Sequence, residues 1–257
     1  MTDRLTCDLT ELPSGEECFH ISLHAPRANS LVPAFLTDLH HAFDHLEKSG
    51  ASKSLITSGR NFSSGGDVAG FYGAAHQDRA EAYARDVVPQ LQDLVLRMIE
   101  APVLIASAVR GAATGGSAGL VFASDLVTAA PDAFVQPYYG IMGYAPDGGW
   151  MATLPELIGL GPARGWLIAN SRQKAPDLLQ MGLAQAVSGE PEAQALQLLE
   201  NVETGTALAS KRLLWTADRV ARVRAALSAE TEAFVQLIGR PEVLARMNDF
   251  LNPTGTE

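Results

Sequence analysis

The segment Pro102-Val-Leu-Ile-Ala-Ser-Ala-Val-Arg-Gly-Ala-Ala-Thr-Gly-Gly-Ser-Ala-Gly119 joins an apolar run to a glycine-rich turn. Residues 102–109 are almost all apolar and too few for a long helix, which predicts a buried strand. Residues 111–119 predict a tight turn, because glycine adopts backbone conformations that other residues avoid. A short helix is expected over 117–124. A buried strand that leads through a glycine turn into a helix is typical of an α/β protein.

The segments on either side alternate between strand and helix patterns. Residues 19–24 place apolar side chains on one face, which indicates a half-buried strand, and residues 31–49 repeat apolar side chains at helical spacing. From Gly149 onward the pattern is almost wholly helical, so we expect an α/β core followed by helices. The predicted strands are 19–24, 54–57, 102–109, 126–129 and 184–187, and the predicted helices are 31–49, 78–100 with a bend at Pro89, 117–124 and three within 204–251.

The composition excludes several classes of protein. The chain has 257 residues, and 19 Lys and Arg against 29 Asp and Glu give a formal net charge of −10. An acidic chain with no basic run does not favour nucleic-acid binding, which depends on neutralising phosphates. Cys7 and Cys18 predict neither a disulfide framework nor a zinc site, and no metal is expected. The longest apolar run is far shorter than the about 20 residues of a membrane span, and no signal-peptide pattern opens the chain, so we expect a soluble cytoplasmic protein without membrane contact.

Gly115-Gly-Ser-Ala-Gly119 fits the G-x-S-x-G pattern of the nucleophile elbow of α/β-hydrolases. In that fold the catalytic histidine follows the serine along the chain. All six histidines here precede Ser117, so no downstream base is available to activate its hydroxyl. We interpret Ser117 as a small residue that opens a helix.

Two other site types find little support. His41 and His45 are four residues apart on a predicted helix, but no carboxylate or third ligand accompanies them at a metal-binding spacing. A solvated helix face is the favoured interpretation. Neither glycine cluster matches G-x-G-x-x-G or the P-loop, so a dinucleotide or nucleoside triphosphate site is not predicted.

Two glycine turns remain, Phe62-Ser-Ser-Gly-Gly-Asp67 and Gly111-Ala-Ala-Thr-Gly-Gly-Ser117. Each follows a predicted strand and precedes a helix. A single turn of this kind is usually structural, whereas two turns together can present two convergent backbone N–H donors. An oxyanion hole requires such a pair, with the donors about 3 Å from an oxygen that gains charge in the transition state.

These turns belong to an ordered set of motifs that resembles the crotonase (enoyl-CoA hydratase/isomerase) superfamily. The resemblance runs from about Phe19 to the C-terminus. Each motif is weak alone, but their order and spacing together are specific. In chain order the motifs are Pro26-Arg-Ala-Asn-Ser-Leu31, Phe62-Ser-Ser-Gly-Gly-Asp-Val68, Arg110-Gly-Ala-Ala-Thr-Gly-Gly116 with Asp125, Pro146-Asp-Gly-Gly149 and Met181-Gly-Leu-Ala-Gln-Ala-Val187.

The resemblance implies a spiral of ββα units over residues 1–200 and a helical region over residues 201–257 that mediates trimer formation, often as a dimer of trimers. It implies an acyl-CoA thioester as substrate, with coenzyme A as part of that substrate and no separate cofactor. It implies that the backbone amides of Ser64 and Gly116 donate the two hydrogen bonds to the thioester oxygen. The further CoA- and substrate-binding residues that it implies are Arg27, Gly65, Gly66, Asp67, Val68, Tyr138 and Tyr139.

The catalytic carboxylates depart from the hydratase pattern. Enoyl-CoA hydratases carry two glutamates, and the matching positions here are Gly119 and Tyr138. Hydration needs a base for water and an acid for the α-carbon, so ordinary hydratase activity is not expected. Asp147 is the acid that remains, in a P-D-x-G-G turn where part of the superfamily places its catalytic aspartate. That part includes the epoxyphenylacetyl-CoA isomerase of the phenylacetate pathway, which also shifts enoyl-CoA double bonds and likewise lacks both glutamates.

The resemblance therefore implies an enoyl-CoA double-bond or ring isomerase with Asp147 as its base. Asp147 also fits an N-cap for a helix starting near Gly149, and this structural role is an alternative. For the whole protein, one alternative is a crotonase-fold hydrolase that cleaves a C–C bond of a β-diketone, with His40, His41 or His45 as candidate contributors. Others are a hydratase-like homologue with little or no hydratase activity and a homologue that keeps the fold only for assembly.

Overall fold

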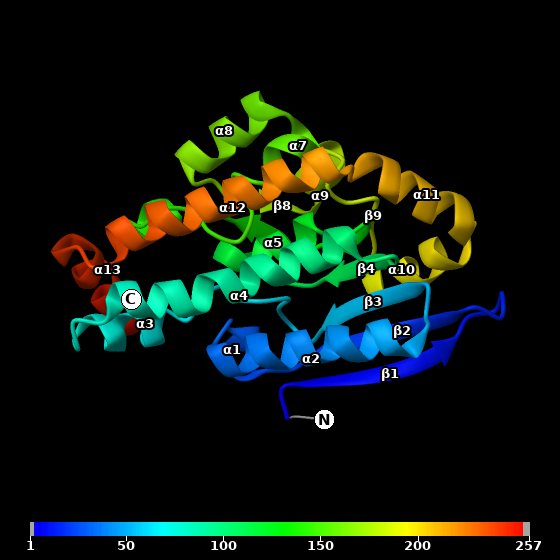
Figure 1. Ribbon diagram of the computed structural model, residues 1–257, viewed down its shortest axis with the longest axis horizontal. Helices are drawn as coiled ribbons and strands as arrows, with labels where there is room; N and C mark the ends of the chain where they lie inside the picture. Colours follow the sequence, from blue (N-terminus) through cyan, green and yellow to red (C-terminus); the bar gives the residue numbers. More distant parts are fainter. Residues whose placement is uncertain (1–2, 254–257) are drawn as a thin grey trace.

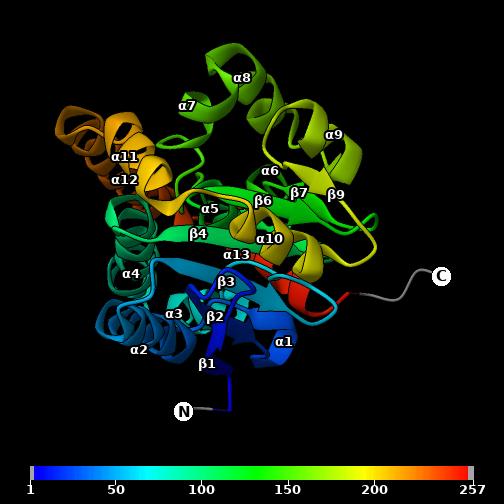
Figure 2. The same ribbon diagram turned by 90° about the vertical axis from the view of Figure 1, so that its right-hand side faces the viewer.

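The computed structural model describes residues 3–253. Within these residues, one sheet has six strands in the order β1-β2-β3-β4-β6-β9 (Figures 1 and 2). β1 and β2 pair antiparallel, and the further pairs of this sheet are parallel. A smaller sheet has the order β5-β7-β8. The strands are β1 (Leu5–Glu11), β2 (Glu17–Leu23), β3 (Lys53–Ser58), β4 (Leu104–Val109), β5 (Ala112–Thr114), β6 (Leu126–Ala129), β7 (Phe134–Gln136), β8 (Gln173–Lys174) and β9 (Ala186–Val187).

Helices cover both faces of the larger sheet. α2 (Pro33–Ser49) and α4 (Ala80–Glu100) pack on one face, and α10 (Pro191–Glu200) packs on the other (Figure 2). In β4, Ile105 belongs to the core beneath α2 and α4, whereas Ala106 belongs to a second core beneath α10. Successive side chains of a strand point to opposite faces, so β4 is buried on both faces, as its apolar run predicts.

The remaining helices are short, and several elements escaped prediction. β1 is largely exposed and gives no apolar periodicity, while α3 contains two glycines, which are poor helix formers. No helix starts at Gly149: α7 begins at Leu154, so the N-cap alternative for Asp147 is wrong. The helices of this part are α1 (Pro26–Asn29), α3 (Val68–Ala75), α5 (Ala118–Phe122), α6 (Tyr139–Met142), α7 (Leu154–Ile158), α8 (Leu160–Ala169) and α9 (Ala175–Gln180), with a 3₁₀ turn at Gly115–Ser117.

Three helices end the described chain, as the apolar spacing predicts: α11 (Thr204–Leu214), α12 (Ala217–Ile238) and α13 (Pro241–Leu251). α12 runs along α4, and α13 turns back to lie against α3 and α6 (Figure 1). These helices therefore contact the part of the molecule that holds the glycine turns. Among residues 3–253, no helix combines the length and the apolar character that a membrane span requires.

A buried ion pair fixes α11 to the α/β core. Lys211 Nζ donates hydrogen bonds to Asp125 Oδ2 at 2.8 Å and to the carbonyls of Met98 and Val103 at 2.9 and 2.8 Å. Asp125 Oδ2 also accepts the Ile105 amide at 2.8 Å. Burial raises the pKa of Asp125 and lowers that of Lys211, and the attraction between the two groups opposes both shifts. Asp125, part of the family motif, thus has a structural role.

Candidate functional site

Three glycine turns meet backbone against backbone. The Ser63 amide donates to the Ala112 carbonyl at 2.9 Å, which sets the first turn beside the second. A Cβ atom on Gly65 would lie 2.5 Å from the Thr114 carbonyl oxygen, and one on Gly148 would lie 2.5 Å from the Gly116 carbonyl oxygen. Gly65 and Gly148 also have φ values of +90° and +67°. Only glycine meets both demands, close approach and positive φ.

A left-handed turn precedes these glycines in the sequence and lies against them. Arg27, Ala28 and Asn29 have φ values of 54°, 54° and 56°, a conformation that costs an L-residue about 1–2 kcal/mol. All three carbonyls accept hydrogen bonds from the first glycine turn. The Ser64 hydroxyl donates to Arg27 O at 2.8 Å, the Ser64 amide to Ala28 O at 2.8 Å and the Ser63 hydroxyl to Asn29 O at 2.7 Å. The two serines thereby hold the turn in its strained form.

This arrangement corrects the donor predicted at Ser64. Its N–H already donates to the Ala28 carbonyl, so it is not available to a substrate oxygen. Two residues further on, the Gly66 amide has no hydrogen-bond acceptor within the part of the chain that the structure describes, and Gly66 lines a cavity together with Gly116. Gly116 lies in the first turn of the 3₁₀ segment, where an amide has no intrahelical acceptor.

The cavity beside the glycine turns has a volume of about 190 Å³. Seven of the ten predicted site residues line it, and three lie outside its lining. The seven are Ser64, Gly66, Val68, Gly116, Tyr138, Tyr139 and Asp147, and the three are Arg27, Gly65 and Asp67.

Asp67 and Arg27 support the site from outside. Asp67 is buried, and its Oδ2 accepts the Tyr83 hydroxyl at 3.1 Å. Arg27 Nη1 lies 3.7 Å from Asp67 Oδ1, and the Arg27 side chain is 60% exposed. Arg27 thus remains accessible from solvent at the edge of the left-handed turn, while Asp67 anchors the start of α3.

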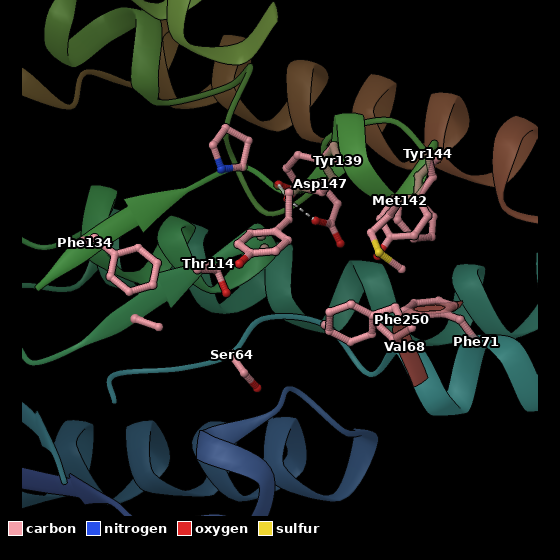
Figure 3. A pocket seen from close by; sticks show the side chains of 17 residues that line it. Ser64, Val68, Phe71, Thr114, Phe134, Tyr139, Met142, Tyr144, Asp147 and Phe250 are labelled. Carbon is pink, nitrogen blue, oxygen red and sulfur yellow. Dashed lines mark hydrogen bonds between the residues drawn. The ribbon is translucent and has the colours of Figure 1, made fainter. Parts of the chain in front are cut away.

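Asp147 is the carboxylic acid that lines the cavity. Its carboxyl lies directly over Gly116, where a Cβ atom would be only 2.9 Å from Asp147 Oδ1. The Tyr139 hydroxyl donates to Asp147 Oδ1 at 2.5 Å and contacts the Asp147 carbonyl at 3.0 Å (Figure 3). Burial raises the pKa of Asp147 to about 6, and the hydrogen bond from Tyr139 opposes this rise. Burial and the nearby carboxyl raise the pKa of Tyr139, which keeps its hydroxyl protonated as a donor.

A second buried acid, Glu230 of α12, accepts hydrogen bonds from the turn that follows Asp147. Its Oε2 accepts the Gly149 amide at 2.8 Å, and its Oε1 accepts the amides of Met151 and Ala152 at 2.5 and 3.1 Å. Glu230 is only 3% exposed, and burial raises its pKa to about 7 against the effect of these hydrogen bonds. The sequence gives no local sign of this role, since Glu230 lies in an ordinary amphipathic helix.

Apolar side chains gather at one end of the cavity, away from Phe134 at the other (Figure 3). Val68 was predicted as a binding residue, and Met142 and Tyr144 lie close to Asp147 in the sequence. Sequence reasoning did not assign the three phenylalanines. Phe71 lies in the unpredicted α3, and Phe234 and Phe250 lie on C-terminal helices with no motif that points to a site. Five side chains at this end are Val68, Phe71, Met142, Tyr144 and Phe250. Phe234 joins them, since its ring contacts those of Phe71 and Tyr144.

The structure also bears on the serine and histidine motifs. Ser117 is fully buried, and its hydroxyl donates to the Thr114 carbonyl at 2.8 Å, which is a local structural role. His41 and His45 are exposed on α2. None of the described residues that line the cavity is a histidine.

The two positions of the hydratase glutamates are structurally different from each other. A Cβ atom at Gly119 would lie 1.7 Å from the Gly148 carbonyl oxygen, so this backbone has no room for any side chain there. Tyr138 lines the cavity and has a φ of 65°. The contact between the glycine turns therefore excludes a carboxylate at Gly119, whereas at the other position Tyr138 takes the place of the glutamate.

Comparisons with known proteins agree with this geometry. The sequence model of the enoyl-CoA hydratase/isomerase family matches residues 15–242. A curated protein of Mycobacterium bovis named probable enoyl-CoA hydratase echA6 is 28% identical over 187 residues, which are 72% of each chain.

Solved structures share the fold over nearly the whole chain. An enoyl-CoA hydratase from Bacillus halodurans matches with a TM-score of 0.83 and 22% identity, covering 96% of this chain and 99% of that one. The human mitochondrial delta3-delta2-enoyl-CoA isomerase matches with a TM-score of 0.83 and 22% identity, covering 98% of both chains. With its crotonase fold and its matching motifs, the chain belongs to the enoyl-CoA hydratase/isomerase family.

Proposed function

We propose that this protein moves a double bond within an acyl-CoA thioester, with Asp147 as the single base and the amides of Gly66 and Gly116 as the oxyanion hole. The observation that carries the proposal is the buried carboxyl of Asp147 directly over Gly116 in the cavity. Coenzyme A enters as part of the substrate. Beside the thioester, Val68, Tyr138 and Tyr139 would contact the acyl-CoA.

The chemistry is a proton shuttle. Asp147 removes a proton from the acyl chain, the thioester oxygen gains charge between the two amides, and Asp147 returns the proton to another carbon. Preorganised amides stabilise such a charge without reorganisation. A carboxyl with a pKa of about 6 is a stronger base than an ordinary aspartate, yet it is still ionised at neutral pH.

The lack of a second acid favours isomerisation over hydration, because hydration uses two groups on the reacting water and carbon. Gly119 has no room for the glutamate that would supply one of them. Within the family, we place the protein with the phenylacetate-pathway epoxyphenylacetyl-CoA and enoyl-CoA isomerases, which share this pattern of acids. No histidine among the cavity-lining residues supports the β-diketone hydrolase alternative.

Replacing Asp147 by Asn removes the base and keeps the shape of the side chain. We expect conversion of 3-enoyl-CoA to 2-enoyl-CoA to fall by about 10²–10⁴-fold, while acyl-CoA binding measured by calorimetry persists. When folding raises the pKa of an acid, the free energy of unfolding falls as the pH rises from the pKa of the unfolded chain to that of the folded protein. The variant should therefore be more stable above pH 6, by up to about 3 kcal/mol for a rise from 3.8 to about 6. Unchanged turnover would eliminate the role of Asp147, and no binding of any acyl-CoA would favour the hydrolase or an inactive homologue.

Replacing Tyr139 by Phe removes the donor to Asp147. Because that hydrogen bond stabilises the ionised carboxyl, its loss raises the pKa of Asp147. We expect the acidic limb of the pH profile of kcat/KM, near pH 6 in the parent protein, to move upward by about one pH unit. Tyr72→Phe is the control, since the Tyr72 hydroxyl bonds Asn248 outside the cavity lining. An acidic limb that stays in place in Tyr139→Phe would show that Tyr139 does not tune the base.

Replacing Glu230 by Gln turns an NH₂ group or a single carbonyl toward three backbone donors, so at least one of the hydrogen bonds to the turn is lost. The turn carries Asp147, and a displacement of about 1 Å at a catalytic group can cost about 10²-fold in rate. We expect a decrease in kcat of about 10- to 100-fold, with Glu230→Asp partly active. Glu232→Gln on the same helix breaks only an exposed pair with Arg85 and should leave kcat unchanged. Equal kcat values for the Glu230→Gln and Glu232→Gln variants would contradict the positioning role.

We also propose that the chain assembles as a homotrimer or as a dimer of trimers through its helical regions. Large apolar side chains are exposed on α7, α8 and the end of α11, and exposed apolar surface commonly marks interaction sites. Light scattering should give three or six times the chain mass of 27.3 kDa, and a monomer at micromolar concentration would contradict the proposal. These side chains are Leu157, Leu160, Ile168, Leu213 and Leu214, with exposed fractions of 43–80%.

A further inference from the structure

We propose that the site selects a compact, uncharged acyl group of about six carbons, because Phe71, Tyr144 and Phe234 close the acyl end of the cavity. The inference rests on the proposed function, since it takes the thioester to lie between Gly66 and Gly116. It adds a size limit and names the residues that set it.

The three aromatic rings form a packed wall. The ring centroids of Phe71 and Phe234 are 5.2 Å apart, and those of Tyr144 and Phe234 are 4.7 Å apart. Phe71 also meets Tyr83 edge to face at 5.2 Å. Phe71 is 3% exposed and Phe234 is 1% exposed, and aromatic pairs of this kind are stabilised beyond the burial of their area. Phe71 and Phe234 are therefore part of the hydrophobic core, and Tyr144 is partly buried against it.

The three rings come from separate parts of the chain. Phe71 lies on α3, Tyr144 follows α6 and Phe234 lies on α12. To lengthen the cavity past Phe71 or Phe234, an acyl chain would have to push a ring out of the core. Displacing a well-packed buried ring is unfavourable, as is the truncation of a core Phe.

The volume of the cavity sets the size limit. The whole cavity, including the space beside Gly116 and Asp147, is about 190 Å³. A dry apolar cavity of about 150 Å³ holds one benzene ring, so the thioester and an acyl group of about six carbons fill the space. The side chains around the acyl end carry no charge, and a charged chain end would lose its hydration there without a partner.

A series of 3-enoyl-CoA thioesters with acyl chains of about six, ten and sixteen carbons tests the limit. We expect kcat/KM to fall by at least about 100-fold from the shortest to the longest, because each methylene that does not fit costs about 10-fold or more. Phe234→Leu removes part of the wall, and we expect it to raise the ratio of kcat/KM for the ten-carbon over the six-carbon substrate by about 10-fold. Phe43→Leu is the matched control, since Phe43 is equally buried in α2 and does not line the cavity.

Thermal unfolding of each variant checks that the fold is retained, and Phe71→Leu serves in its place if Phe234→Leu does not fold. Equal use of short and long chains by the parent protein would overturn the size limit and leave the proposed function standing. The same conclusion would follow if Phe234→Leu or its substitute left the substrate ratio at the value of Phe43→Leu. Failure of every acyl-CoA to bind and react would instead overturn the proposed function, and the size limit with it.

Discussion

Backbone-to-backbone contact among three glycine turns is the constraint on which the rest of the site depends. The first and second turns touch at Gly65 and Thr114, and the second and third touch at Gly116 and Gly148. A methyl group at Gly65 or Gly148 would meet a carbonyl oxygen at 2.5 Å, far inside the normal contact distance. The contacts bring an acid from the third turn over an amide of the second. They also exclude a side chain at Gly119, so one constraint accounts both for the position of Asp147 and for the glutamate missing at Gly119.

The C-terminal helices supply further contacts to the site that the glycine turns form. Glu230 supplies three hydrogen bonds to the turn that carries Asp147, and Phe234, one helical turn further along α12, forms part of the cavity wall. A carboxylate that satisfies three amides without a counter-ion is stable when buried only because each amide donates to it. The same helix thus contacts both the turn that carries Asp147 and the apolar end of the cavity.

The sequence predicted those parts of the fold that depend on local pattern. The apolar run 102–109 and the amphipathic helices of 204–251 appear as β4 and α11 to α13, because burial on two faces and helical periodicity leave clear signals. Asp147, Gly116 and Gly66 were found through motifs. The roles of Ser64, Glu230 and Phe234 were not, because each depends on contacts between segments far apart in the chain. Ser64 lies in the motif that predicts an oxyanion-hole donor and has a backbone N–H. Only the structure shows that this N–H already donates to the Ala28 carbonyl.

The hydrogen bond from the Gly149 amide to Glu230 joins residues that are 81 positions apart in the sequence. Synthesis proceeds from the N-terminus, so this contact can form only after the whole segment between Gly149 and Glu230 has been made. Until α12 has been made, the amides after Asp147 lack the acceptor that Glu230 supplies. A nascent chain therefore contains Gly66, Gly116 and Asp147 before the hydrogen bonds that fix the turn after Asp147 can form. The arrangement of these three residues is therefore complete only after the C-terminal helices have folded against them.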